Sequence, residues 1–365
     1  TGPLKALIVT GCLAQRYKEE IKTEIPEVDA ILGTNSYEDI VKAVHEALGG
    51  TFYENFKTLE GLPSIHTKRS VTTGGHFAYL KIAEGCNKRC TYCIIPYARG
   101  RVRSRKIAHV MDEVHALAAK GYKEVVLTGI HLSSYGVDFP AEEKETLLSL
   151  IRAVHEVEGI ERIRLGSLEP GIITEEFVQS IAALPKMCPH FHLSLQSGCN
   201  ATLKRMNRRY TAEEYYEKCQ LLRKYFDNPA LTTDVIVGFP GETEEEFAES
   251  KAFVDKVDFY ETHIFKYSRR EGTKAAAMKD QVPDQIKAAR SAELLELNRK
   301  KQAVYEERLL GTTQEVLIEE KIVRDGEELQ IGHTKEYVKI GVKNPNNLIN
   351  QLVNVEIENQ LQILH

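Results

Sequence analysis

The chain has 365 residues, of which 42% are hydrophobic and 28% are charged, as is ordinary for a globular protein of two or three domains. No stretch approaches the roughly 20 uninterrupted apolar residues of a membrane span, and no signal segment opens the chain, so we expect a cytoplasmic protein without membrane contact. The net charge of −5 excludes a uniformly basic nucleic-acid binder, and the odd count of seven cysteines excludes a simple disulfide framework.

The first 50 residues predict an α/β fragment. Apolar runs predict strands and helical periodicity predicts helices, in the order 4–10, 14–25, 28–33 and 36–49. Two strands make a poor sheet, and the chain starts without Met at the edge of the first strand, so we expect that N-terminal sequence is missing. Residues 49–76 contain Pro63 and many Gly, Thr, Ser and Lys residues, which predicts a linker.

From Phe77 onward, apolar runs alternate six times with helical patterns. The predicted strands are 79–83, 124–130, 162–168, 191–195, 231–238 and 261–267, and the helices between them are 107–119, 143–158, 174–184, 211–226 and 243–257. Two helices open with capping boxes, Thr211 with Glu214 and Thr243 with Glu246. Repeated βα units imply a parallel sheet, here a partial (β/α)6 barrel whose chemistry lies at the C-terminal strand ends.

A charged stretch with helical periodicity, at about 284–310, follows this series. Short β-like runs follow, broken by Asp325-Gly326 and by the Asn- and Pro-containing segment 344–347. The last part of the chain is therefore expected to be a small all-β module.

Three cysteines, Cys86, Cys90 and Cys93, follow the first strand of the series with the spacing C-x3-C-x2-C. A cubic iron–sulfur cluster needs several thiolates on one short loop, and this spacing supplies them. Structural zinc is the alternative, but zinc takes a closed set of four ligands, and no fourth Cys or His follows at zinc-finger spacing. Three thiolates on a four-iron cube leave one iron open, which indicates catalysis.

This spacing, with Tyr92 just before the last cysteine, resembles the radical S-adenosylmethionine superfamily. The resemblance implies a [4Fe–4S] cluster on Cys86, Cys90 and Cys93, whose open iron chelates S-adenosylmethionine; reduction then cleaves this cofactor to a 5′-deoxyadenosyl radical. Over nearly the whole chain, further segments resemble the methylthiotransferases: TGCLAQRYKEE (10–20), IAEGCNKRCTYCIIPYARGRVRSR (82–105), IRLGSLEP (163–170), HLSLQSG (192–198), DVIVGFPGETEEEF (234–247) and GHTKEYVKIGV (332–342).

The family resemblance implies three domains: a partial methylthiotransferase N-terminal domain at 1–65, a radical SAM core at 72–305 and a TRAM RNA-binding domain at 306–365. Cys12 matches the third of three cysteines that hold an auxiliary [4Fe–4S] cluster in the full-length family members. The segment that should carry the first two is absent, which puts sulfur insertion by the chain as it stands in doubt. Three cysteines without ligand spacing are expected to be ordinary core or surface residues: Cys188, Cys199 and Cys219.

Residues at the C-terminal strand ends are expected to line the S-adenosylmethionine pocket beside Tyr92. They are Gly129, Ser167, Glu169, Ser194, Gln196, Gly238 and Phe239, with His131 and Tyr267 nearby. Glycine lets backbone approach a ligand closely, and Ser, Glu and Gln offer hydrogen bonds to ribose and to the amino acid moiety. A turn glycine or an internally satisfied polar residue is the alternative at each position. The superfamily's usual Gly-Gly-Glu after the second strand is replaced here by TGIH (128–131).

Two basic runs are predicted to border the same face, namely Arg99, Arg101, Arg103, Arg105 and Lys106, and Lys204, Arg205, Arg208 and Arg209. Solvated surface charge is the alternative to RNA binding for both runs. The family resemblance is greatest to the MtaB branch, and it implies a tRNA methylthiotransferase that adds a methylthio group to C2 of N6-threonylcarbamoyladenosine at position 37 in the anticodon loop.

The threonylcarbamoyl group ends in a carboxylate, which favours an arginine as its partner. The candidate substrate-binding residues are Arg269, Arg270 and Arg208, with solvent-facing phosphate contacts as the alternative. An electron donor such as flavodoxin or ferredoxin is the second expected partner. Sister branches that act on N6-isopentenyladenosine or on a ribosomal protein aspartate remain alternatives, as does a non-catalytic RNA-binding module.

Overall fold

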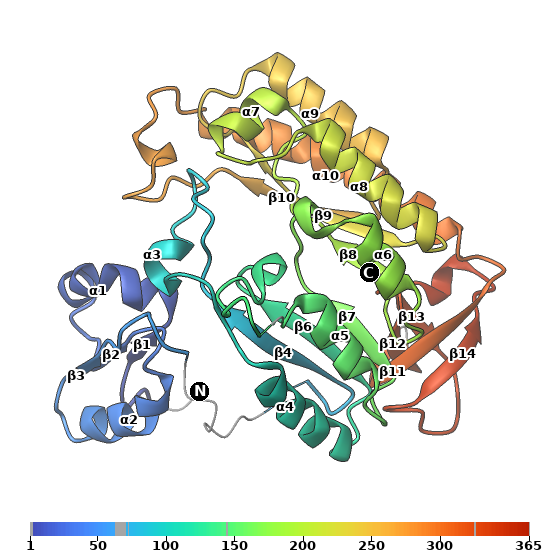
Figure 1. Ribbon diagram of the computed structural model, residues 1–365, viewed down its shortest axis with the longest axis horizontal. Helices are drawn as coiled ribbons and strands as arrows, with labels where there is room; N and C mark the ends of the chain where they lie inside the picture. Colours follow the sequence, from blue (N-terminus) through green and yellow to red (C-terminus); the bar gives the residue numbers. More distant parts are fainter. Residues whose placement is uncertain (1–2, 63–70, 72, 144, 325, 365) are drawn as a thin grey trace.

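The computed structural model describes residues 3–62, 71, 73–143, 145–324 and 326–364. Figure 1 shows three parts along the chain: an N-terminal α/β unit, a central series of strands and helices, and a C-terminal antiparallel sheet. Within the described residues, no helix is both long enough and apolar enough to cross a membrane.

The N-terminal unit is a three-stranded parallel sheet with helices. Its elements are β1 (Ile8–Thr10), α1 (Cys12–Glu24), β2 (Ala30–Leu32), η1 (Tyr37–Asp39), α2 (Ile40–Leu48) and β3 (Tyr53–Asn55). Strand β3 lies inside the predicted linker, so that prediction is wrong for residues 53–55. Its residues, Tyr-Glu-Asn, are at most half-buried and lack apolar alternation, so the pattern gave no sign of a strand. Residues 63–70 and 72, where the rest of the linker and the boundaries at 65 and 72 fall, lie outside the described residues.

The six predicted strands of the central series are confirmed, and all run parallel. They are β4 (Phe77–Glu84), β6 (Glu124–Gly129), β7 (Arg162–Leu165), β8 (His190–His192), β9 (Ala230–Val237) and β10 (Glu261–Lys266). They form two sheets, β4-β6-β7 and β8-β9-β10, that meet at a parallel bridge between Leu168 and Leu193. A short strand, β5 (Arg103–Ser104), adds antiparallel to the end of β4 and was not predicted.

Helices cover one face of these sheets and pack against the apolar side chains of the strands. The covering helices are α4 (Ile107–Ala119), α5 (Leu147–His155), α6 (Glu175–Ala182), α8 (Ala212–Tyr225) and α9 (Glu244–Val257), and two short helices that were not predicted are α3 (Ile95–Arg99) and α7 (Asn200–Arg205). Buried residues such as Leu80, Ile82 and Leu127 fill the layer between sheet and helices. Both predicted capping boxes are present, at Thr211 and at Thr243.

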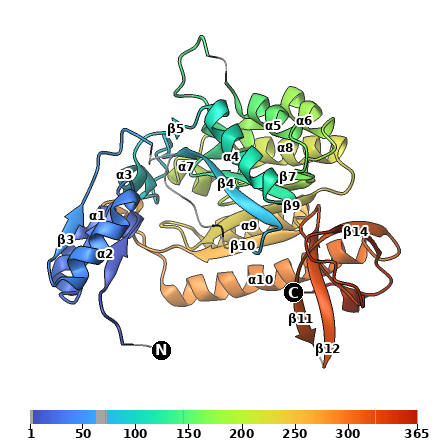
Figure 2. The same cartoon turned by 90° about the horizontal axis from the view of Figure 1, so that it is seen from below.

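The C-terminal part begins with α10 (Asp284–Glu307) and continues as an antiparallel sheet, which confirms the predicted all-β module. Its strands are β11 (Thr313–Arg324), β12 (Glu327–Thr334), β13 (Lys339–Val342) and β14 (Leu352–Glu356), in the order β13-β12-β11-β14. Figures 1 and 2 show this sheet at one end of the central series.

Two buried arginines of β7 fix the position of the module. The Arg162 guanidinium donates to the backbone oxygens of Glu315 (2.6 Å) and His333 (2.9 Å), and that of Arg164 donates to Lys335 O (2.8 Å). Arg164 also pairs with Glu124, with Nε 2.7 Å from Oε1. Because Glu124 and Arg162 open their strands, the module lies at the N-terminal strand ends, opposite the loop of Cys86.

Candidate functional site

Cys86, Cys90 and Cys93 lie between β4 and α3 and line one pocket of about 550 Å³. Four cations line the same pocket, Lys88, Arg89, Arg101 and Lys274, and no carboxylate does. The three thiols predicted from their spacing therefore share one cationic pocket at the C-terminal end of the first strand.

Backbone contacts hold the thiol loop in shape. The amide of Cys86 donates to Gly100 O at 3.0 Å, and that of Cys93 donates to Cys90 O at 3.1 Å. Gly85 has φ +71°, and a Cβ at this position would lie 1.8 Å from the carbonyl oxygen of Arg101. Only glycine fits there, which lets the loop close on the chain that follows α3.

Three cysteine thiols on one loop are the donor set that a cubic iron–sulfur cluster takes, although burial opposes their ionisation. Burial raises the pKa of Cys86 to about 11 and raises the pKa of Cys93 as well. Both groups are therefore protonated in the metal-free protein and release protons when they bind iron. Across the described residues, no three His, Cys, Asp or Glu side chains are grouped so as to hold a single metal ion.

Glu169, a predicted cofactor residue, is the centre of a charged network beside the thiols. Its carboxylate lies 2.8 Å from Lys88 Nζ, 3.2 Å from His131 Nε2 and 3.3 Å from Arg208 Nη1. Burial raises the pKa of Glu169, but its contacts with His131 and Lys88 and the charge of Arg208 lower it to about 2. This network joins the thiol loop to three strand-end segments.

We expect Glu169→Gln to lose stability in a pH-dependent way. Because the folded pKa of about 2 lies below the usual 4.5, ionised Glu169 contributes stability that is fully present above pH 4.5 and is lost as pH falls toward 2. Urea unfolding of both proteins across this range gives the difference in free energy of unfolding, which should shrink as the pH falls. A difference that does not change with pH would contradict the ionised network.

The predicted serines and Gln196 gather beside this network. The hydroxyls of Ser167 and Ser194 lie 2.9 Å apart, and Ser194 O accepts a hydrogen bond from Tyr210 at 2.6 Å. Gln196 has φ +72°, and its amide donates to Asp234 O at 2.8 Å. Ser194 O also accepts from Arg208 Nη2 at 3.3 Å, which joins the serines to the network of Glu169, but Ser167, Ser194 and Gln196 are not among the residues that line the thiol pocket.

Tyr92 and Phe239 lie in an apolar cluster together with Tyr267, with ring centroids of Phe239 6.3 Å from Tyr92 and 5.4 Å from Tyr267. Gly238 has φ +69°, and its amide donates to Glu242 Oε2 at 2.6 Å. Gly129 packs against Ala83, whose carbonyl oxygen would lie 3.2 Å from an added Cβ. Each of these residues has a packing role that the structure shows directly.

Arg208 is placed differently from the other two predicted substrate residues. Its side chain is buried, with Nη1 3.3 Å from Cys90 Sγ and Nε 2.9 Å from the hydroxyl of Tyr210. Arg269 and Arg270 are exposed on the segment after β10 and are not among the residues that line the thiol pocket. Lys274, four residues beyond Arg270, lines it instead and was missed, because a lone lysine in a loop carries no pattern.

Part of each basic run is buried or paired, whereas Arg101 lines the thiol pocket and Lys204 and Arg209 are exposed without an ion pair among the described residues. In the first run, Arg103 is buried and three others pair with acids: Arg99 with Glu84, Arg105 with Glu113 and Lys106 with Glu143. In the second run, Arg205 pairs with Glu246. Charge counting along the chain overlooks these partners because they come from distant segments.

Cys12 lies at the first turn of α1, where its Sγ accepts a hydrogen bond from Arg99 Nε at 3.0 Å. Because Arg99 ends α3, this contact brings Cys12 beside the helix that follows the thiol loop. The three cysteines predicted to be ordinary residues, Cys188, Cys199 and Cys219, are buried.

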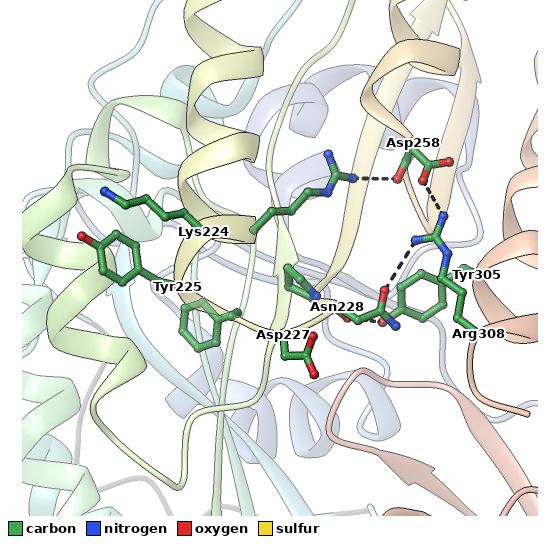
Figure 3. Close-up of a pocket in the computed structure, with 10 residues that line it drawn as sticks. Lys224, Tyr225, Asp227, Asn228, Asp258, Tyr305 and Arg308 are labelled. Atoms are coloured by element: carbon green, nitrogen blue, oxygen red, sulfur yellow. Dashed lines mark hydrogen bonds and ion pairs between the residues drawn. The ribbon is translucent and has the colours of Figure 1, made fainter. Parts of the chain in front are cut away.

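A second pocket of about 540 Å³ lies near the C-terminal ends of α8 and α10 (Figure 3). Its charges satisfy one another: Arg308 Nη2 lies 2.6 Å from Asp258 Oδ2, and Arg223 donates to Asp258 O at 2.8 Å. Tyr305 donates to Asn228 O at 2.7 Å. No cysteine lines this pocket, so the thiol pocket is the candidate functional site.

Comparison with known proteins identifies the family. Residues 80–254 match the model of the radical SAM superfamily. The chain is 43% identical to the ribosomal protein uS12 methylthiotransferase RimO of Lachnoclostridium phytofermentans, over 92% of this chain and 75% of that protein. It is 38% identical to RimO of Clostridioides difficile, over 99% of this chain and 82% of that protein.

The chain is also 38% identical to the threonylcarbamoyladenosine tRNA methylthiotransferase MtaB of Bacillus subtilis, over 98% of this chain and 79% of that protein. All three relatives are methylthiotransferases, and each match spans most of this chain. The chain belongs to the radical S-adenosylmethionine methylthiotransferase family, and it is an enzyme whose cofactors are a [4Fe–4S] cluster and S-adenosylmethionine.

Proposed function

We propose that this methylthiotransferase modifies a protein substrate, ribosomal protein uS12, rather than the tRNA expected from sequence. Two relatives named for different substrates, RimO of Clostridioides difficile and MtaB of Bacillus subtilis, are both 38% identical to the chain, so identity to them does not separate the two substrates. RimO of Lachnoclostridium phytofermentans, which is named for uS12, is more similar than either, at 43% identity.

The charge of the C-terminal module carries this proposal. Residues 312–365 contain nine Asp and Glu against five Lys and Arg. Three of the five cations are paired: Lys321 with Glu328, Lys335 with Glu315, and Lys343 with Glu327. An acidic surface repels the phosphate backbone of tRNA and attracts the basic surface that ribosomal proteins use to bind RNA.

Within the proposed site, Cys86, Cys90 and Cys93 would hold the cluster. When bound, the cluster supplies the electron that cleaves S-adenosylmethionine to methionine and a 5′-deoxyadenosyl radical. Glu169, Ser167 and Ser194 would offer hydrogen bonds to that cofactor, while Lys88 and Arg208 hold the Glu169 carboxylate ionised and oriented toward the thiol loop.

We also propose the domain assignment that the family resemblance implies. A methylthiotransferase N-terminal domain would end near 65, the radical SAM core would span 72–305, and a TRAM domain would follow from 306. Cys12 would be a ligand of an auxiliary [4Fe–4S] cluster, and a flavodoxin or ferredoxin would donate electrons. The contact between Cys12 and Arg99 supports this because it places Cys12 beside the helix that follows the thiol loop.

Modification of both substrates in one cell tests the proposal. The natural gene product is expressed in a bacterium that lacks its own uS12 and tRNA methylthiotransferases, and mass spectrometry measures methylthio groups on uS12 and on tRNA nucleosides. We expect uS12 to be modified and the tRNA to remain unmodified. Methylthiolated threonylcarbamoyladenosine without modified uS12 would establish the tRNA alternative.

Charge reversal on the module gives a matched comparison in the same assay. Glu320 and Glu356 are exposed acids of the module that have no ion pair among the described residues, and Glu217 on α8 is an exposed acid far along the chain from it. Glu320→Lys with Glu356→Lys should lower uS12 modification, whereas Glu217→Lys should not. An equal loss of uS12 modification in the double variant and in Glu217→Lys would show that the acidic surface of the module does not bind the substrate.

A further inference from the structure

The thiol pocket contains more positive charge than its own side chains neutralise. Of its four cations, Lys88 is paired with Glu169 at 2.8 Å, whereas Arg89, Arg101 and Lys274 are exposed. Arg101 and Lys274 make no ion pair among the described residues, and no carboxylate lines the pocket. Besides Arg89 on the thiol loop itself, two cations from the segments on either side of it, Arg101 and Lys274, therefore line the pocket without an ion-pair partner from the described part of the chain.

Backbone contacts with the thiol loop fix the main chain at both of these residues, whose side chains are exposed. Arg101 follows Gly100, whose carbonyl oxygen accepts from the Cys86 amide, and its own carbonyl packs on Gly85. On the other side, Ala275 N donates to Thr91 O at 2.9 Å, which fixes the turn that carries Lys274. Thr273 is buried, and its hydroxyl accepts from the amide of Ala276.

From this arrangement we propose that Arg101 and Lys274 bind the carboxylate of the substrate side chain and make the enzyme specific for an aspartate. The inference rests on the proposed function, in which the substrate is uS12. An arginine and a lysine each pair with a carboxylate through charge-assisted hydrogen bonds, and the planar guanidinium can do so with two parallel bonds. A carboxylate held between these two residues keeps its neighbouring carbon atoms beside the thiol loop, where the cofactor is cleaved.

Binding to the metal-free chain tests the inference without relying on turnover. Fluorescence anisotropy compares uS12 with a uS12 variant in which the target aspartate is replaced by asparagine. We expect the chain to bind the aspartate form roughly 10- to 100-fold more tightly, as for a charge-assisted hydrogen bond that is lost. Lys274→Met and Arg101→Met should each reduce this ratio to less than about threefold.

Two control variants distinguish binding of the substrate aspartate by these cations from the effect of removing a positive charge anywhere on the segment. Lys279→Met removes an exposed lysine further along the same segment that does not line the pocket, and it should leave the ratio unchanged. Lys274→Arg keeps the charge and should keep most of the preference.

Each outcome bears on a different claim. An unchanged ratio in both Met variants, with a shifted reduction potential of the reconstituted cluster, would show that these cations serve the cluster and would overturn the inference. Equal binding of the two uS12 forms by the unmodified chain would overturn it as well, while uS12 modification in cells would still support the proposed function. Absence of uS12 binding together with tRNA modification in cells would overturn both.

Discussion

Replacing Cys86, Cys90 and Cys93 together by Ala is expected to abolish both the iron–sulfur chromophore and the formation of 5′-deoxyadenosine. These three thiols line the same pocket, and removing them leaves a cluster with no thiolate on its loop. Iron and sulfide content after anaerobic reconstitution, and 5′-deoxyadenosine after reduction with S-adenosylmethionine, provide the two measurements.

Cys188→Ala is the matched control for this prediction, because it removes a buried thiol that does not line the pocket. It should keep its iron and its cofactor cleavage. A triple variant that retains both would show that the cluster is bound elsewhere.

Arg164→Met is expected to lower the free energy of unfolding by about 3 to 5 kcal/mol, the usual consequence of leaving a buried charge unpaired. Arg164 and Glu124 are 3% and 4% exposed, and the charge of Arg164 with its hydrogen bonds outweighs burial and lowers the pKa of Glu124. Without the guanidinium, the buried Glu124 keeps only the more distant Arg162, whose Nη1 lies 3.8 Å from Glu124 Oε2, and the oxygen of Lys335 loses its donor. Urea unfolding measures the change.

The double variant Arg164→Met with Glu124→Met is the control that isolates the unpaired charge. It should recover a large part of the lost stability, because the carboxylate that lost its partner is then also removed from the buried layer. If Arg164→Met were as stable as the parent protein, water would have to reach Glu124. Arg164 would then not fix the position of the C-terminal module.

The regular part of the fold could be predicted because its signals are local. Strands such as β4 and β9 were predicted from apolar runs, and the capping boxes at Thr211 and Thr243 mark the starts of their helices through a Glu three positions later. Strand β3 has no such signal, since it is short, polar and at the edge of its sheet. The short antiparallel addition of β5 to β4 depends on the shape of the thiol loop, which the sequence does not display.

The candidate site also has one part that could be predicted from the sequence and one part that could not. The three cysteines lie within eight residues and could be recognised from their spacing. The partners of Glu169 come from three separate segments, at Lys88, His131 and Arg208, so only the folded chain brings them together. For this reason Arg208 was predicted from its basic run as a substrate contact, although its side chain contacts both Cys90 and Glu169.

Electron paramagnetic resonance of the reduced, reconstituted enzyme tests most directly whether three thiols leave one iron open to S-adenosylmethionine. Spectra are recorded before and after this cofactor is added, and again with S-adenosylhomocysteine as a control. We predict a reduced [4Fe–4S] signal whose shape changes when S-adenosylmethionine is added. A reducible cluster whose spectrum is the same with and without S-adenosylmethionine would contradict an open iron in the pocket of Cys86, Cys90 and Cys93.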